Sequence, residues 1–313
     1  MNRLALAVDL GGTELRAAVV DDTGVVLAHS ATETDSRGGP AAVVAQIVDL
    51  ATRVRAETGQ AAVVGMGVAA PGPLDPLAGI SIAPPTLDGW RDVPLAALLQ
   101  DRLGLSVRLE NDANAAALGE WRFGAGRGSQ NMVFVTVSTG IGGGVIADGR
   151  LLRGRRGLAA EIGHMTIDLG SPESLFGGAC GVWEALASGT ALGREATRRM
   201  AGPDGALLRA FAGAGTVTAR HVADAARQAD KVALALIAEE ARLLGIGFVN
   251  LLHLYSPERL IVGGGLSAAL DLMQDEIART IAARVLAPYR DVPVVAAALR
   301  AQAGLVGAAC LVF

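Results

Sequence analysis

Three polar side chains stand in a row at Glu110, Asn111 and Asp112, between a strand-like segment and an alanine-rich stretch that begins a helix. Polar groups at the point where a strand turns into a helix occupy the usual position of active sites in α/β proteins. Helix capping is a structural reason for the same residues, because Asn111 or Asp112 can accept hydrogen bonds from the first free N–H groups of the helix. This stretch alone leaves both interpretations open, and the other polar motifs favour chemistry.

Three glycine-rich turns follow predicted strands, at residues 11–13, 140–144 and 263–265. Glycine lets backbone N–H groups approach phosphate oxygens without a Cβ atom in the way, and the hydroxyl of Thr13 or Thr139 adds a donor. None of these turns has the spacing of a Walker loop or of a dinucleotide-binding fingerprint. One such turn could equally be a hairpin, but three at strand ends indicate a ligand that carries phosphate.

Asp9 ends the first predicted strand beside the turn formed by Gly11, Gly12 and Thr13. A carboxylate in this position can hold a hydrated Mg²⁺ ion or direct its waters toward the phosphates of a nucleotide. The alternative is an aspartate that only caps the turn. We expect the magnesium role, because the turn beside Asp9 suits phosphate.

A second group of polar side chains contains Glu161, His164 and, further along the chain, Glu184. A carboxylate accepts two hydroxyl hydrogen bonds and an imidazole donates or accepts one, so this set suits a polyhydroxylated ligand. A lone histidine is more often structural, yet these residues stand in an apolar, glycine-rich stretch, which favours function. Cys180 with one histidine does not make a zinc site, and we interpret Cys180 and Cys310 as small buried residues.

The elements that must position these residues are strands and helices in alternation. One meander has predicted strands at 4–8, 15–20 and 25–29, and a similar unit has strands at 131–137, 145–147 and 151–152, with 138–144 as its glycine-rich turn. Further strands are predicted at 62–68, 105–109, 260–262 and 294–297, and helices at 40–57, 94–103, 218–228, 231–252, 267–283 and 304–312. The alternation indicates an α/β fold, and the repeated unit indicates two lobes of similar design.

Composition limits the classes of protein that fit. The 313 residues allow two domains with a core each, and 51% hydrophobic with 19% charged residues indicates a compact globular protein. The net charge of −4 gives no basis for a nucleic-acid or anionic-membrane partner, and we expect neither. The start does not have the pattern of a signal peptide, and no apolar run is long enough to span a bilayer. The cysteines are also few, so we expect a cytoplasmic protein.

In their order, these motifs resemble those of the ROK family of sugar kinases and repressors, within the actin-like ATPase superfamily. The segments that carry the resemblance are 9–13, 71–72, 110–114, 138–144, 161–164, 184–189 and 263–265. The resemblance implies a two-lobed actin-like ATPase (ribonuclease H-like) fold, with a duplicated β-meander plus helices and a cleft between the lobes. One lobe would comprise 1–115 with 298–313 and the other 116–297, and by analogy the protein would be a homodimer.

The resemblance also implies an ATP-dependent kinase that transfers the γ-phosphate to a hexose hydroxyl, usually that on C6. Asp112 would be the general base, and the sugar would be held by Gly72, Asn111, Glu161, His164 and Glu184. The phosphates of ATP and its Mg²⁺ would face Asp9, Gly11, Gly12, Thr13, Thr139 and Gly140, and the nucleoside would face Gly264 and Gly265. Glucose is the first substrate to expect, followed by an N-acetylhexosamine or another hexose.

The chain departs from the family pattern at a zinc site. Members usually carry a structural zinc ion held by a histidine and three cysteines, whereas this chain has Leu175, Gly177 and Val182 at the cysteine positions, with Cys180 out of register. We therefore expect no structural zinc. The loop would instead be packed by Phe176, Val182 and Trp183.

Other departures from the family pattern bear on sugar specificity, and other functions within the family can be weighed against the kinase. Thr86 stands where many members have Asn, which affects sugar choice, while Ala160 and Glu14 replace a usual Gly and Lys at tolerant positions. A sugar-sensing repressor of this family would carry a DNA-binding domain before Asp9, for which the sequence leaves no room. Two alternatives stay open: a sugar-binding protein without catalytic activity, and a kinase that uses polyphosphate. The presence of Asp9, Asp112 and the glycine turns argues against a protein without catalytic activity.

Overall fold

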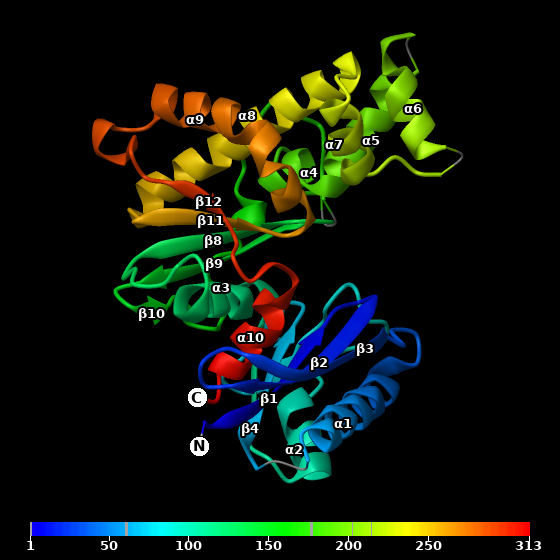
Figure 1. The fold of residues 1–313 in the computed structure, drawn as a ribbon, viewed down its shortest axis with the longest axis vertical. Helices are drawn as coiled ribbons and strands as arrows, with labels where there is room; N and C mark the ends of the chain where they lie inside the picture. Colours follow the sequence, from blue (N-terminus) through cyan, green and yellow to red (C-terminus); the bar gives the residue numbers. More distant parts are fainter. Residues whose placement is uncertain (1, 60–61, 176–177, 202, 214) are drawn as a thin grey trace. The chain divides into compact units, whose positions relative to one another are not determined.

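The computed structural model describes residues 2–59, 62–175, 178–201, 203–213 and 215–313. The chain forms two compact units, each built on a sheet with helices against it (Figure 1). The first unit comprises Met1–Gln130, Gly144–Ala160 and Ala298–Phe313, and the second comprises Asn131–Gly143 and Glu161–Ala297. The lobes expected from the sequence, with a boundary after residue 115, stay a prediction.

The first sheet has the strand order β3-β2-β1-β4-β7. Its strands are β1 (Leu4–Leu10), β2 (Glu14–Asp21), β3 (Val26–Glu33), β4 (Val63–Ala70) and β7 (Val107–Asn111). The first three form the predicted antiparallel meander, and β4 and β7 run parallel to β1. Because Asp9 pairs with Ala69 and Asn111 pairs with Ala70, the ends of these three parallel strands lie at one edge of the sheet.

Helices cover both faces of this sheet. On one face, alternate residues of β1 such as Leu6 and Val8 join a core with α1 (Gly39–Glu57) and α2 (Leu95–Leu103). On the other face lie α3 (Asp112–Phe123) and α10 (Ala303–Cys310), whose alanines pack on the small residues of the sheet. The close approach requires glycine: an added Cβ atom at Gly307 would lie 1.7 Å from the carbonyl oxygen of Ala115 in α3.

The second sheet repeats this design with the strand order β10-β9-β8-β11-β12. Its strands are β8 (Met132–Val137), β9 (Ile141–Ala147), β10 (Arg150–Leu151), β11 (Arg259–Gly263) and β12 (Val294–Ala296). The strands β8, β11 and β12 are parallel, as β1, β4 and β7 are in the first sheet. The duplicated meander predicted from the sequence is therefore present.

The predicted turn at 138–144 is too long, because Gly142, Gly143 and Gly144 lie in strand β9. An added Cβ atom at Gly143 would lie 2.2 Å from Cδ1 of Ile162, and one at Gly144 would lie 2.6 Å from Cβ of Ala117 in α3. These glycines therefore allow other elements to pack directly on the strand. Such a reason depends on contacts that are distant in sequence, so the local pattern could not reveal it.

The remaining elements complete the two units. They are the hairpin β5 (Leu74–Asp75) and β6 (Ile80–Ser81), the helices α4 (Trp183–Ala187), α5 (Gly189–Arg199), α6 (Ala206–Ala212), α7 (Ala219–Arg227), α8 (Lys231–Tyr255) and α9 (Leu270–Arg284), and the 3₁₀ helices η1 (Ile162–His164), η2 (Pro203–Gly205), η3 (Gly265–Ala269), η4 (Ala287–Tyr289) and η5 (Arg300–Gln302). The helix predicted at 267–283 thus starts as η3 and continues as α9. Within the described part of the chain, none of the helices has the length and apolar character needed to cross a membrane.

Candidate active site

The corner between β7 and α3 carries the first predicted site residues. Asn111 caps the helix: its Oδ1 atom accepts hydrogen bonds from the N–H groups of Ala113 at 3.0 Å and Asn114 at 3.2 Å. Asp112 is the first residue of α3 and is exposed, with Oδ1 accepting the N–H of Ala113 at 2.8 Å. The capping role therefore falls to Asn111, and Asp112 lies exposed beside it.

Glu110, which precedes this corner, is fully buried. Its Oε1 atom accepts hydrogen bonds from the backbone N–H of Asn111 and from Nδ2 of Asn114, both at 3.1 Å. Its Oε2 atom accepts one from Nε of Arg153 at 2.7 Å. The corner is thus fixed from inside the protein by a carboxylate, to which the sequence assigns no separate role.

Two loops of the first unit lie near this corner and near the first glycine turn. An added Cβ atom at Gly72 would lie 3.4 Å from Nδ2 of Asn111, so the Gly72 loop runs beside the asparagine side chain. In the glycine turn, the N–H of Gly11 donates to the carbonyl of Glu14 at 2.9 Å. An added Cβ atom at Gly12 would lie 2.6 Å from Cβ of Thr86, so this turn touches the loop expected to affect sugar choice.

Asp9 lies at the same edge of the first sheet and is held by Arg16. The Nη2 atom of Arg16 donates to Oδ2 of Asp9 at 2.5 Å, and the Asp9 side chain is 13% exposed. Burial raises the pKa of the Asp9 carboxyl above its ordinary value, while the charge and hydrogen bond of Arg16 oppose that rise. Because one oxygen is already engaged, this carboxylate suits contact with the waters of a hydrated Mg²⁺ ion better than full coordination.

In the second unit, Glu184 at the start of α4 is bonded to the second glycine turn. Its Oε2 atom accepts a hydrogen bond from the N–H of Ile141 at 2.7 Å. An added Cβ atom at Gly140 would lie 2.3 Å from the same oxygen, and one at Gly163 would lie 2.1 Å from the carbonyl oxygen of Ile141. The structure therefore brings together the Thr139–Gly140 turn, Glu184 and the segment of η1.

Glu161 directly precedes η1 and His164 is its last residue, and both side chains are exposed. Nδ1 of His164 lies 3.8 Å from Oε2 of Glu161, and the side chains are 58% and 56% exposed. At this distance and exposure the pair is weak, and it carries opposite charges only when the imidazole is protonated. Both side chains are therefore available to a ligand.

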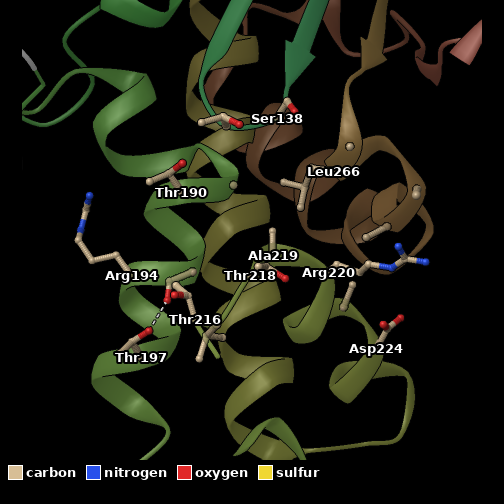
Figure 2. A pocket seen from close by; sticks show the side chains of 18 of the residues that line it. Ser138, Thr190, Arg194, Thr197, Thr216, Thr218, Ala219, Arg220, Asp224 and Leu266 are labelled. Carbon is tan, nitrogen blue, oxygen red and sulfur yellow. Dashed lines mark hydrogen bonds between the residues drawn. The ribbon is translucent and has the colours of Figure 1, made fainter. Parts of the chain in front are cut away.

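A cavity of about 790 Å³ opens within the second unit (Figure 2). Its walls come from the turn after β8, the first turns of α5, the loop before α7, α7 itself and η3. Its lining includes Ser138, Thr139, Gly189, Thr190, Val217, Arg220, Asp224, Gly265 and Leu266. The sequence predicts Thr139 and Gly265 at a nucleotide site and misses the walls from α5 and α7, because no recognisable motif marks those helices.

The lining of this cavity contains charged residues such as Arg220 and Asp224 beside apolar and hydroxyl-bearing ones. Val217 and Leu266 present apolar surface from the loop before α7 and from η3, whereas Thr139 and Thr190 carry hydroxyls. Thr190 lies at the start of α5, which Ser188 caps by accepting the N–H of Ala191 at 3.2 Å. An apolar wall suits a flat base, and hydroxyls with a helix start suit phosphates. The cavity therefore fits a nucleotide.

The region of the missing zinc cysteines is described only in part. Phe176 and Gly177 lie outside the described residues. Val182 and Trp183 are buried, and Trp183 packs edge-on against the ring of Phe248 with centroids 5.7 Å apart. Among the described residues, no group of three or more His, Cys, Asp or Glu side chains is placed to hold a metal ion. The absence of zinc stays a prediction.

The two cysteines differ in environment. Cys310 in α10 is buried, as predicted, and burial raises its pKa to about 11. Cys180 is exposed, so the prediction that it is a buried residue is wrong. It lies in the loop before α4, where its Sγ atom contacts the carbonyl of Gly178. A loop position without a packing helix explains the exposure.

Comparisons with known proteins agree with this architecture. The family model described as the ROK family matches residues 5–313. The glucokinase of Streptomyces coelicolor is 39% identical over 318 aligned residues, which cover 98% of this chain and 97% of that protein. A solved structure of a ROK family glucokinase from Streptomyces griseus, in complex with glucose and AMPPNP, is 37% identical with a TM-score of 0.84 and covers 99% of each chain.

A ROK hexokinase from Thermus thermophilus has also been solved and is 35% identical, with a TM-score of 0.81 over 100% of this chain and 98% of that one. These structures extend over nearly the whole chain. They confirm the predicted α/β fold of the actin-like ATPase type. The chain belongs to the ROK family.

Proposed function

We infer that this chain is an ATP-dependent hexose kinase. The observation that carries the inference is the cavity of the second unit, whose apolar wall, hydroxyls and helix start suit a nucleotide. The full-length likeness to glucokinases supports it, and one of these was solved with glucose and with AMPPNP, an analogue of ATP. The reaction is transfer of the γ-phosphate of ATP to a hydroxyl group of a hexose, and we propose the C6 hydroxyl of glucose.

Asp112 is the proposed general base. It is an exposed carboxylate at the first turn of α3, next to Asn111, whose position is fixed by its capping bonds. A carboxylate there can accept the proton of a sugar hydroxyl as its oxygen attacks the phosphorus atom. Positioned proton transfer of this kind contributes about 10²–10⁴-fold to a rate.

The proposed sugar ligands come from several segments. The first unit would supply Asn111 and the Gly72 loop, which the structure places side by side. The second unit would supply Glu161, His164 and Glu184. Carboxylates, an amide and an imidazole can each bond to ring hydroxyls, which fixes the orientation of the attacking oxygen.

The proposed phosphate contacts come from the two turns that carry Gly11, Gly12, Thr13, Thr139 and Gly140, with Gly264 and Gly265 toward the nucleoside. The N–H of Gly11 is bonded to the carbonyl of Glu14, so Gly11 would shape its turn rather than donate to a phosphate. The two turns would bind and orient the nucleotide rather than form covalent bonds, as phosphoryl transfer requires. A Mg²⁺ ion bound with ATP would neutralise charge on the phosphate oxygens. Asp9, held in place by Arg16, would contact the waters of that ion.

Sugar choice is the finer part of the proposal. Glucose is supported by the glucokinase activity for which the relatives are named and by the bound glucose in one of them. Thr86 contacts Gly12 in the first glycine turn, so its hydroxyl lies on a loop that touches the proposed phosphate site. An N-acetylhexosamine is the next substrate to test.

A coupled assay of ADP release tests this function. The purified protein is given MgATP with glucose, mannose, N-acetylglucosamine and N-acetylmannosamine in turn, and polyphosphate replaces ATP in a parallel series. We expect turnover with MgATP that is fastest on glucose. A folded protein that binds a hexose but turns over none of them with ATP would contradict the kinase assignment, and turnover only with polyphosphate would correct the donor.

A further inference from the structure

The buried carboxylate of Glu110 is joined to one cation, Arg153. The Nε atom of Arg153 lies 2.7 Å from Oε2 of Glu110, and the side chains are 39% and 1% exposed. A buried carboxylate is costly unless it is paired and hydrogen-bonded. Glu110 is therefore held by its partners, whereas Arg153 is partly exposed, so the ion pair is half-buried and solvent screens part of its attraction.

One end of this ion pair holds the corner that carries the proposed base. Oε1 of Glu110 accepts the backbone N–H of Asn111 and the side-chain Nδ2 of Asn114. Asn111 is the cap of α3, and Asn114 lies in the first turn of that helix and is 1% exposed. The single carboxylate thus fixes the chain directly before Asp112 and the helix turn directly after it.

The other end holds the segment 153–160, which leads to Glu161. The carbonyl of Arg153 accepts the N–H of Ala159 at 3.2 Å, which closes the segment into a compact loop. An added Cβ atom at Gly157 would lie 2.2 Å from Cδ of Pro76, so the loop also packs on the hairpin that follows Gly72. Arg153 is therefore one of the residues that hold this segment, together with the packing on Pro76.

We propose that the ion pair of Glu110 and Arg153 is a positioning device, which fixes the corner of Asp112 relative to the loop 153–160 that precedes the sugar-binding Glu161. This inference rests on the proposed function and adds two residues to it. Neither residue touches the reacting atoms; they act through the residues they hold. A displacement of about 1 Å in a catalytic group can lower a rate by about 10²-fold, so loss of the ion pair between Glu110 and Arg153 should slow phosphoryl transfer.

A merely structural pair would behave differently from a positioning pair. If Arg153 only neutralises a buried charge, removal of both charges should restore the enzyme, because well-packed neutral replacements of a buried pair are often tolerated. If the pair positions the two segments, removal of both charges should restore stability and leave catalysis impaired. The double variant therefore separates the two roles.

The experiment compares Arg153→Met, Arg153→Lys and the double variant Glu110→Gln with Arg153→Met in the full chain. The control is Arg53→Gln, which removes an ion pair of nearly equal length, 2.8 Å, on the exposed surface of α1. For each protein, kcat, the KM for glucose, the KM for ATP and the melting temperature are measured. Glucose binding is measured separately by calorimetry, so that positioning is tested even if turnover with ATP fails.

We expect Arg153→Met to lower kcat/KM for glucose by about 10²-fold, with the KM for ATP changed less than about twofold. Arg153→Lys should regain part of the loss, and the double variant should melt like the wild type while staying about tenfold slow. Arg53→Gln should match the wild type. Full activity in the double variant, or wild-type kcat/KM and glucose affinity in Arg153→Met, would overturn the positioning role.

If the wild type itself fails to turn over any hexose with ATP, the proposed function has failed rather than the positioning role. In that case, weaker glucose binding in the double variant than in Arg53→Gln still supports the positioning role of the ion pair. Equal binding in the two proteins would then reject it.

Discussion

Asn111 combines a structural and a proposed binding role in one side chain. Its Oδ1 atom caps α3, and its Nδ2 group is the proposed donor to the sugar. Asn111→Asp keeps an acceptor for the cap, whereas Asn111→Ala loses it at a cost of about 1 kcal/mol in the free energy of unfolding. Both variants lose the amide donor, so both should bind glucose more weakly by calorimetry.

The control for this prediction is Asp230→Ala. Asp230 caps α8 by accepting the N–H of Ala233 at 3.0 Å, so its loss should destabilise the protein in urea unfolding without a change in glucose affinity. Asn111→Asp with unchanged glucose affinity would show that the side chain is a cap alone.

Glu240 is a buried acid that gives stability a pH dependence. It lies on α8, is 3% exposed, and its Oε1 atom has no hydrogen-bond partner among the described residues. Burial, with a smaller contribution from the charge of Glu239, raises the pKa of Glu240 well above its ordinary value. The carboxyl of Glu240 therefore binds its proton more tightly in the folded state than in the unfolded state. The stability that this protonation contributes is lost as the pH rises from the pKa of the unfolded state through the pKa of the folded state.

The side chain of the Glu240→Gln variant cannot ionise. The difference between its melting temperature and that of the wild type should therefore shift in favour of the variant as pH is raised from about 5 to about 8. The measurement is a series of thermal unfolding curves across this range. The control is Asp49→Asn, whose side chain is 72% exposed. Parallel curves for Glu240→Gln and the wild type would contradict the raised pKa.

At the scale of elements, Glu184 links α4 to the glycine turn before β9. Glu184→Gln keeps an oxygen that can accept the N–H of Ile141, whereas Glu184→Ala leaves that N–H without its acceptor and releases the turn. The Ala variant should raise the KM for ATP by about tenfold, because a buried N–H loses its acceptor, and the Gln variant should raise it by less, because its amide oxygen still accepts that N–H. Both should raise the KM for glucose.

Steady-state kinetics with each substrate varied in turn measures the KM for ATP and the KM for glucose in both variants. An equal KM for ATP in the two variants would mean that the hydrogen bond does not hold the turn for the nucleotide.

The elements that the sequence predicts well are those whose signal is local. Buried apolar runs and short turns mark both meanders, and a proline at the start with a glycine after the end marks α1. The corner of Glu110, Asn111 and Asp112 is also predictable, because adjacent polar side chains directly after a buried strand indicate a helix cap or a ligand site. The choice of Asn111 over Asp112 as the cap requires the backbone geometry.

The elements that the sequence misses depend on contacts between distant segments. The glycines 142–144 have the local composition of a turn, yet they lie in strand β9, where Gly143 leaves room for Ile162 and Gly144 for Ala117. The walls of the proposed nucleotide cavity from α5 and α7 carry small, hydroxyl-bearing and charged residues in no recognisable spacing. Glu110 belongs to a visible motif, but its partner Arg153 is 43 residues away and carries no local signal.

At the scale of the whole molecule, two sheets of the same strand order form two compact units. The proposed sugar ligands belong to both units, so we predict that glucose draws them together. Small-angle scattering should show a smaller radius of gyration with saturating glucose than without it. A galactose-treated sample serves as control if galactose does not bind, and an unchanged radius with bound glucose would contradict closure.

The central claim is that this molecule is a hexose kinase with Asp112 as its base, and the most direct test is Asp112→Asn. Single-turnover phosphate transfer from MgATP to glucose is measured beside glucose affinity and melting temperature. We predict a rate lower by about 10²–10⁴-fold, with glucose affinity and melting temperature near those of the wild type. A rate equal to that of the wild type would contradict the claim.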